Sequence, residues 1–277
     1  MEAPLMTQNT TETLTNTRLS ENEAELTQAL YNSWRTQNPL NEDDWSNYAT
    51  DDETAYRVQD ELTRLKNEPV GGYKVSLTSK QTQDMFDSDE PLYGAQLASH
   101  FLHAPTTVNL SDLMEPLVEV ELCFRAKEDL SPDDTLEDLL NKTTVAPALE
   151  VPDSRFKDWF PSLSKYMVMS DAAVGGLVVY GDEFDTKLFK TVDALENVNC
   201  TLLHDGEELK SGKSTEVLGN PLKSLKWLVD KLATQHKTLK KDQRVSSGTF
   251  VLPPSLTKGA WQARFDNGLG NVDLDVK

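Results

Sequence analysis

The pattern of apolar and polar positions divides the chain into a helical beginning and a longer part dominated by strands. Ser20 opens a helical pattern that runs to Leu30, and Glu23, three residues further on, completes a capping box. A second helix is predicted over residues 51–66, where apolar residues recur three and four positions apart. We interpret it as a scaffold helix that covers a sheet. A third helix is predicted over residues 221–236, where leucine and valine follow one side.

Strand patterns begin after the glycine pair at residues 71–72 and continue to the C-terminus. Residues 205–207 read as the turn of a hairpin. Because helices lead and strands follow, the order predicts the α+β class rather than a regular βαβ alternation. We therefore expect a helical N-terminal region over residues 19–70 and a β-rich domain over residues 71–277. The predicted strands cover residues 73–77, 118–125, 177–180, 199–203, 245–252, 259–265 and 272–276.

Charge and hydropathy exclude several classes of function. The formal net charge of −19 repels the phosphates of nucleic acid and leaves no polybasic anchor for an anionic membrane. No apolar run is long enough to span a bilayer. Residues 1–18 are polar, lack the features of a signal peptide, and are expected to form a disordered tail. We expect a protein that binds neither nucleic acid nor membrane.

The two cysteines predict no disulfide framework. Cys123 and Cys200 both lie in apolar, strand-like runs, and no CxxC motif is present. Buried, unreactive thiols are the simplest interpretation. They are consistent with a reducing cytoplasm, which we expect to be the location of the protein.

Two glutamates stand on one side of a predicted strand. Glu119 and Glu121 are two positions apart in an apolar run, so their side chains project from the same face. Two such carboxylates repel each other unless a positive charge lies between them. On spacing alone, an exposed face with two solvated carboxylates is the simpler interpretation.

A third glutamate favours a metal site instead. Glu150 ends the apolar run at residues 146–149, where burial is expected, and a buried carboxylate needs a cation or a proton. Together with Glu119 and Glu121 it would give three oxygen ligands for a hard ion such as Mg²⁺ or Mn²⁺, with positions left for water and substrate. The four histidines are not at ligand spacings with these glutamates.

A lysine in a predicted strand is the second candidate. Lys74 follows the paired glycines at residues 71–72 in a chain that is short of basic residues. Such a lysine can neutralise a substrate carboxylate or an enolate. The residues themselves leave open an ordinary exposed lysine.

Several motifs, taken in order, resemble one known family. The resemblance runs from about residue 50 to the C-terminus, and it is to the 2-keto-4-pentenoate hydratase and 4-oxalocrotonate decarboxylase family of the fumarylacetoacetate hydrolase-like superfamily. The matching segments are GYKVSLTS at 72–79, EPLYG at 90–94, VEVEL at 118–122, PALEVPDSR at 147–155 followed by DW at 158–159, GNPL at 219–222, and SGT at 247–249.

The resemblance implies a fold, a metal and a substrate class. It implies a mixed β-roll with helices outside it, and Mg²⁺ or Mn²⁺ held by Glu119, Glu121 and Glu150. It also implies a small 2-oxo acid that chelates the metal through its carboxylate and 2-oxo oxygens, with Lys74 as the catalytic residue nearby. Relatives generally assemble as dimers or larger rings, so a homo-oligomer is expected. The substrate-binding candidates carried over from the family motifs are Ser79, Arg155, Asp171 and Thr249.

The implied activity is that of a hydratase or a decarboxylase. Hydration of an acid such as 2-hydroxypenta-2,4-dienoate and loss of CO₂ pass through the same dienolate or enolate, so one site can host either. The chain departs from the family pattern at Leu92, where an aspartate is usual, and at Ala173 and Val174, where serines are usual; Ser76 replaces a glycine. These departures favour enolisation or decarboxylation over hydration. They also motivate a second hypothesis, a catalytically degenerate member that serves as a binding or regulatory partner.

Overall fold

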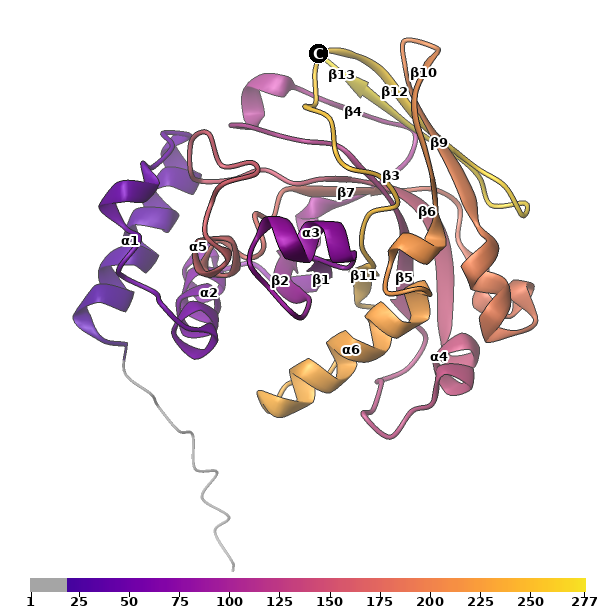
Figure 1. Cartoon of the computed structure of the whole chain (residues 1–277), viewed down its shortest axis with the longest axis horizontal. Helices are drawn as coiled ribbons and strands as arrows, with labels where there is room; N and C mark the ends of the chain where they lie inside the picture. Colours follow the sequence, from indigo (N-terminus) through magenta and orange to yellow (C-terminus); the bar gives the residue numbers. More distant parts are fainter. Residues whose placement is uncertain (1–18) are drawn as a thin grey trace, which may run out of the picture.

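The computed structural model describes residues 19–277, so the tail predicted for residues 1–18 lies outside the described residues. The chain forms an α+β fold of two curled sheets with helices around them (Figure 1). The α-helices are α1 (Glu21–Thr36), α2 (Asp52–Lys66), α3 (Lys80–Met85), α4 (Leu136–Lys142), α5 (Lys165–Ser170) and α6 (Pro221–Thr234). Short 3-10 helices are η1 (Glu42–Asp44), η2 (Ala98–His100), η3 (Leu110–Asp112), η4 (Thr186–Phe189), η5 (Val192–Asn197) and η6 (Ser214–Glu216).

The strands form two sheets. The larger has the order β2-β1-β11-β5-β6-β7-β3, with β8 paired to β6, and the smaller has the order β10-β9-β12-β13-β4. The strands are β1 (Val70–Ser76), β2 (Leu92–Leu97), β3 (Phe101–His103), β4 (Thr106–Val108), β5 (Glu119–Ala126), β6 (Thr143–Val151), β7 (Leu177–Tyr180), β8 (Phe184–Asp185), β9 (Asn199–His204), β10 (Glu207–Lys213), β11 (Arg244–Ser246), β12 (Gly259–Phe265) and β13 (Gly270–Val276).

The helices follow their sequence signals closely. The predicted capping box is present: the Ser20 hydroxyl accepts from the backbone N–H of Glu23, and the Glu23 carboxylate accepts from the backbone N–H of Ser20. Helix α1 continues to Thr36, beyond the predicted end at Leu30. Asn220 caps α6, whose first residue is Pro221.

One predicted strand is much shorter than expected. The apolar run at residues 245–252 predicted a single strand, but β11 ends at Ser246. Gly248 has φ +117, and its backbone N–H donates to the carboxylate of Glu121 rather than to a neighbouring strand. The regular strand ends here because Gly248 turns to cap a buried carboxylate, although the backbone N–H groups of Ser247 and Phe250 still donate to carbonyls of β5.

The packing places the carboxylate-bearing strands at the centre of the molecule. Strand β6 contacts β12 and β13, which joins the two sheets, and its residues from Val145 to Val151 are buried. Helix α2 packs between α1 and α5, which lie at the opposite end of the molecule from β9 and β10 in Figure 1, and α6 packs against α4 and β1.

Within residues 19–277, no helix is both long and apolar enough to cross a membrane. The division between a helical region and a β-domain at residue 70 stays a prediction.

Candidate metal centre and active site

Four adjacent strands bring together the predicted metal ligands and the predicted catalytic lysine. Lys74 lies on β1, Ser246 on β11, Glu119 and Glu121 on β5, and Glu150 on β6. Lys74 is the direct partner of Ser246 in the parallel pair β1–β11, and Glu119 is the direct partner of Glu150 in the antiparallel pair β5–β6. Lys74 and Glu150 are 76 positions apart in the sequence, and their strands are separated by only two others in the sheet.

The three glutamates form one cluster. Glu119, Glu121 and Glu150 each offer a carboxylate oxygen, and these oxygens lie within 4.8 Å of one another. Glu121 and Glu150 are each only 1% exposed, whereas Glu119 is half-buried and lines a cavity. The alternative interpretation, a solvated pair of carboxylates on an exposed strand face, is wrong.

The hydrogen bonds around this cluster leave several oxygens free. One oxygen of Glu121 accepts from the Ser246 hydroxyl at 2.6 Å and from the backbone N–H of Gly248 at 2.8 Å. Among the described residues, no hydrogen-bond donor reaches its other oxygen, Oε1, or Oε2 of Glu150. Buried acceptors without donors are costly, and a set of carboxylate oxygens suits a hard divalent ion. The residues present therefore fit Mg²⁺ or Mn²⁺.

Burial and mutual repulsion both oppose ionisation of these acids. Burial, then the neighbouring Glu150, raises the pKa of Glu119 to about 8, although Lys74 acts against this shift. Burial, then Glu150 and Glu119, raises the pKa of Glu121 well above its ordinary value, although Ser246 and Gly248 hydrogen-bond its charged form. Perturbed acids in a buried cluster are typical of functional sites.

Lys74 supplies the positive charge of the cluster. Its side chain is 2% exposed, and its Nζ forms an ion pair with Oε1 of Glu150. Burial alone would lower the pKa of Lys74, but the carboxylates of Glu150 and Glu119 outweigh it and raise that pKa. The alternative of an ordinary exposed lysine is wrong.

A small cavity opens beside Lys74 and Glu119. Its volume is about 50 Å³, which is room for at least one water molecule. Apart from Lys74 and Glu119, hydroxyl-bearing and apolar residues form the wall. They are Val75, Ser76, Leu77, Thr78, Thr82, Phe86, Pro152, Trp159, Phe160, Val168, Val174, Thr249 and Pro253.

Two of the predicted substrate-binding residues lie at or near this cavity. Thr249 lines it and also lines a neighbouring cavity, which includes Ser79. The Ser79 hydroxyl caps α3 by accepting from the backbone N–H of Thr82 at 3.2 Å. Thr249 therefore lines the same cavity as Glu119 and Lys74, whereas Ser79 lines the neighbouring cavity.

The other two predicted substrate-binding residues pair with each other instead. Arg155 and Asp171 form a buried ion pair, and neither lines the cavity beside Glu119. The Arg155 guanidinium also donates to the backbone carbonyls of Gly175, at 2.8 Å, and Asp171, at 3.1 Å. Because these donors are already engaged, the geometry favours a positioning role for the pair.

The segment held by this pair has an unusual backbone. Ala172, Ala173 and Val174 have φ values of 51°, 55° and 49°, a left-handed turn that is costly for residues with a side chain and most of all for valine. Arg155 bonds the carbonyls on either side of the turn, and Val174 at its end lines the cavity. The pair thus fixes part of the cavity wall from outside.

Gly94 allows this turn to lie against β2. A Cβ at position 94 would lie 1.8 Å from the carbonyl oxygen of Ala172.

Leu92, which replaces the usual aspartate of the family motif, is 2% exposed in the apolar core and is not part of the cavity lining. Sequence reasoning missed Phe86, Phe160 and Val168 as cavity residues, because apolar side chains carry no chemical signal of a site.

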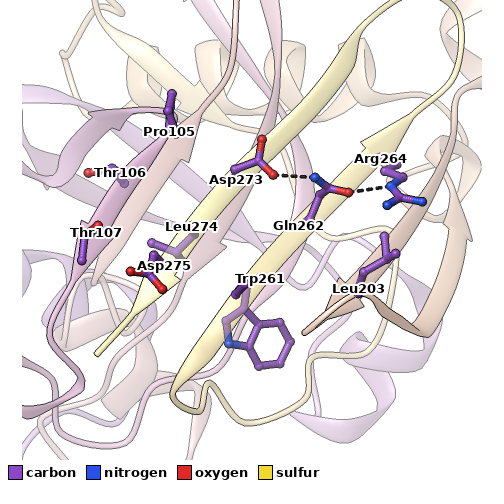
Figure 2. A pocket seen from close by; sticks show the side chains of 12 residues that line it. Pro105, Thr106, Thr107, Leu203, Trp261, Gln262, Arg264, Asp273, Leu274 and Asp275 are labelled. Atoms are coloured by element: carbon purple, nitrogen blue, oxygen red, sulfur yellow. Dashed lines mark hydrogen bonds between the residues drawn. The ribbon is translucent and has the colours of Figure 1, made fainter.

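A larger groove lies on the smaller sheet. Figure 2 shows its floor on β12 and β13, where Gln262 donates to Asp273 at 2.5 Å and Arg264 donates to Gln262 at 2.5 Å. Three of its polar side chains are therefore engaged with one another. In the described part of the chain, the only group of three or more metal-ligating side chains is the glutamate cluster, which makes that cluster the candidate functional centre.

Relatives of known name decide the family. A 2-keto-4-pentenoate hydratase of Burkholderia vietnamiensis is 31% identical over 79% of this chain and 83% of its own length. A 2-oxo-hept-4-ene-1,7-dioate hydratase of Escherichia coli is 32% identical over 75% of this chain and 80% of its own. This chain belongs to the 2-keto-4-pentenoate hydratase family. The family predicted from the sequence motifs is thus confirmed, although no family model matches the chain.

Solved structures confirm the predicted fold of this family member. The 4-oxalocrotonate decarboxylase of Pseudomonas putida G7, complexed with magnesium and adipate, matches with a TM-score of 0.83 at 24% identity, over 93% of this chain and 98% of that one. A fumarylpyruvate hydrolase of Pseudomonas aeruginosa, in complex with Mn²⁺ and pyruvate, matches with a TM-score of 0.55 at 17% identity, over 74% and 88% of the two chains. The fumarylacetoacetate hydrolase-like mixed β-roll is therefore the fold of this chain.

Proposed function

We propose that this chain is a divalent-metal-dependent lyase, a hydratase or decarboxylase, that acts on a small 2-oxo acid. The observation that carries the proposal is the cluster of three glutamates whose oxygens lie within 4.8 Å of one another, with acceptors that no donor among the described residues reaches. Three carboxylates, one lysine and one divalent ion balance in charge, which the buried site requires. The names of the relatives, hydratases of 2-oxo or 2-hydroxydienoic acids, support the reaction class.

In this proposal Glu119, Glu121 and Glu150 hold Mg²⁺ or Mn²⁺. The bound ion would supply a Lewis acid that stabilises negative charge on an enolate. Ser246 and Gly248 hold one Glu121 oxygen by hydrogen bonds, so they orient this ligand from behind.

Lys74 is the proposed catalytic residue. Its ammonium is buried beside the cluster and lines the cavity, where it can neutralise a substrate carboxylate or hold a proton at the 2-oxo oxygen. Thr249, also on the cavity wall, is the proposed hydrogen-bonding residue for substrate, with Ser79 one cavity further out. Arg155 and Asp171 act on the substrate indirectly, through the turn that carries Val174.

A metal titration followed by an assay tests the proposal. The protein is stripped with a chelator, and its melting temperature is measured as Mg²⁺ or Mn²⁺ is added. Consumption of 2-hydroxypenta-2,4-dienoate is then followed by absorbance, and CO₂ release from oxaloacetate is measured separately. We expect metal-dependent stabilisation and turnover of at least one class of acid. Failure to bind either metal would refute the proposal.

Metal binding without turnover of any 2-oxo acid would favour the second hypothesis, a non-catalytic binding partner. The replacement of the usual serines by Ala173 and Val174, the latter on the cavity wall, is the observation that favours it.

We also propose that the protein is a cytoplasmic homo-oligomer. The family resemblance supports the assembly, and the buried free thiols of Cys123 and Cys200 are consistent with a reducing compartment. Light scattering on the purified protein measures the assembly directly.

A further inference from the structure

Four hydroxyl-bearing residues line the cavity of the candidate active site, and the protons of two of these hydroxyls are already engaged. The Thr82 hydroxyl donates to the carbonyl of Ser79 at 3.0 Å, and the Thr249 hydroxyl donates to the carbonyl of Val251 at 2.8 Å. Thr82 and Thr249 therefore offer the cavity hydrogen-bond acceptors rather than free donors.

The other two hydroxyls, of Ser76 and Thr78, are free. Within residues 19–277 neither one has a hydrogen-bond partner, although Ser76 is half-buried and Thr78 is only 3% exposed. Most buried polar side chains have a partner, either in the protein or in an ordered water. Because both residues line the cavity, a polar group inside it is the partner that their hydroxyls can reach.

Both free hydroxyls belong to the polar end of the cavity. Ser76 follows Lys74 by two positions on β1, so the two side chains project from the same face of the strand. A Cβ at Gly248 would lie 2.2 Å from the Thr78 hydroxyl oxygen, so this oxygen lies directly against Gly248. The backbone N–H of Gly248 in turn donates to Glu121. The two hydroxyls thus lie next to the proposed catalytic lysine and next to the support of a proposed metal ligand.

The remaining wall offers no comparable donor. The indole N–H of Trp159 already donates to the carbonyl of Glu115 at 2.9 Å. The side chains of this wall are apolar or aromatic, namely Phe86, Trp159, Phe160, Val168 and Val174. A small polar molecule in the cavity is therefore held from the side of Ser76 and Thr78.

The cavity suits a water molecule in volume and in chemistry. Its volume of about 50 Å³ exceeds the roughly 10–15 Å³ that one water requires. A buried water also needs two to four polar partners, and here Lys74 donates, Glu119 accepts, and the hydroxyls of Ser76 and Thr78 do either.

We propose that Ser76 and Thr78 are positioning residues that hold the water molecule which adds to the substrate. This inference rests on the proposed function, because it places the 2-oxo acid at the glutamate cluster. In hydration of 2-hydroxypenta-2,4-dienoate, the water oxygen forms a bond to C4. The second proton of the water and the proton of the enol end on C3 and C5, which leaves a 4-hydroxy-2-oxo acid. Decarboxylation adds no water to the substrate, so the inference favours hydration.

Two reactions at the same site test the role of Ser76. Hydration of the dienoate requires the held water, whereas exchange of the C3 protons of 2-oxopentanoate for deuterium requires only enolisation. Both are measured on the Mg²⁺-loaded protein, by absorbance and by NMR. Ser76→Ala is expected to lower kcat for hydration about tenfold to a hundredfold, because one hydrogen bond to the reacting water is lost. Its exchange rate and its stabilisation by Mg²⁺ are expected to stay at the wild-type values.

Further variants control for a merely structural effect. Ser76→Thr keeps the hydroxyl and is expected to recover hydration, and Ser255→Ala, at an exposed position outside the cavity lining, is expected to change neither reaction. Thr78→Val removes the second hydroxyl and is expected to lower hydration alone, so the test stays decisive if Ser76→Ala misfolds. A high-resolution crystal structure of the Mg²⁺-loaded wild type supplies a readout besides activity, namely a water hydrogen-bonded to Ser76 and Thr78.

The outcomes distinguish this inference from the proposed function. Equal loss of hydration and exchange in Ser76→Ala would assign its hydroxyl to the enolate and overturn the inference. Full hydration by both hydroxyl-deficient variants, a wild type that enolises without hydrating, or a crystal structure without this water would overturn it as well. The proposed function survives each of these results. A wild type that binds Mg²⁺ but shows neither exchange nor turnover would overturn the proposed function and this inference together.

Discussion

Glu119 and Glu150 are direct cross-strand partners in the antiparallel pair β5–β6. Like charges at such positions destabilise a sheet, and here Glu150 is only 1% exposed. Lys74 compensates only one of the two charges, through its ion pair with Glu150. The sheet therefore carries a repulsion that a divalent ion would relieve, and five predictions follow from this relationship and its surroundings.

Removing one charge is expected to abolish metal binding without unfolding the protein. Glu121→Gln keeps an oxygen that can accept from Ser246 and Gly248, but it lowers the negative charge of the cluster. A metal at roughly a hundredfold excess over its Kd stabilises by about 3 kcal/mol, and the variant should lose this gain. Thermal melts with and without Mn²⁺ measure it. Glu208→Gln, on the exposed β10, is the control, and an unchanged Mn²⁺ response in Glu121→Gln would exclude this ligand assignment.

Metal affinity is expected to rise with pH. Burial raises the pKa of Glu119 to about 8, so near neutral pH a proton competes with the metal for this carboxylate. The affinity should increase by up to about tenfold per pH unit for each proton released, and level off once the carboxylates are ionised. Mn²⁺ titrations between pH 6 and 9 measure this slope. A flat profile would show that the acids are already ionised without metal.

The metal-free protein is expected to show the opposite trend in stability. A carboxyl whose pKa is raised on folding binds its proton more tightly in the folded state. Its contribution to the free energy of unfolding is therefore fully present below the pKa that this carboxyl has in the unfolded chain. That contribution is lost as the pH rises through about 8. Chemical denaturation in the presence of a chelator, repeated across this range, should give a falling free energy of unfolding. Added Mg²⁺ should remove most of the decline.

Loss of the buried lysine is expected to destabilise the metal-free protein. Lys74→Met leaves Glu150 without its cation beside Glu119, a change that costs about 3–5 kcal/mol for buried ion pairs. Denaturant unfolding measures the loss, and Mg²⁺ should recover part of it, while turnover stays abolished. Lys80→Met, at an exposed position on α3, serves as the control. Equal stability of Lys74→Met and wild type would contradict the ion pair.

Replacing Arg155 is expected to loosen the left-handed turn at residues 172–174, because this arginine bonds the carbonyls on either side of it. Arg155→Lys has one donor nitrogen in place of the separate guanidinium nitrogens that bond Asp171 and the carbonyl of Gly175, so about 2–4 kcal/mol of stability should be lost. Hydrogen exchange at residues 172–175 should accelerate, and KM should rise because Val174 lines the cavity. The exposed Arg264→Lys is the matched control. Unchanged exchange in Arg155→Lys would argue against a positioning role.

Local signals in the sequence determined the helices α1, α2 and α6 and the identity of the glutamate pair, whereas the short helices α3, α4 and α5 were not predicted. The capping box at Ser20 acts within one turn, and the projection of Glu119 and Glu121 to one face follows from the geometry of any strand. The apolar run before Glu150 and the paired glycines before Lys74 singled out these two residues, and the family motifs added the fold, which the structural neighbours bear out. The end of β11 at Ser246 was missed because a long-range hydrogen bond to Glu121 ends it.

The sequence by itself thus determined the longer helices, several strands and the candidate metal ligands. Only the tertiary structure decided that Glu119 faces Glu150, that Lys74 compensates one of them, and that Arg155 holds a backbone turn. It also decided that Phe86 and Phe160 share a wall with Lys74. The physical reason is that register between distant strands and burial of side chains depend on the packing of the whole chain. No spacing within a single segment encodes either one.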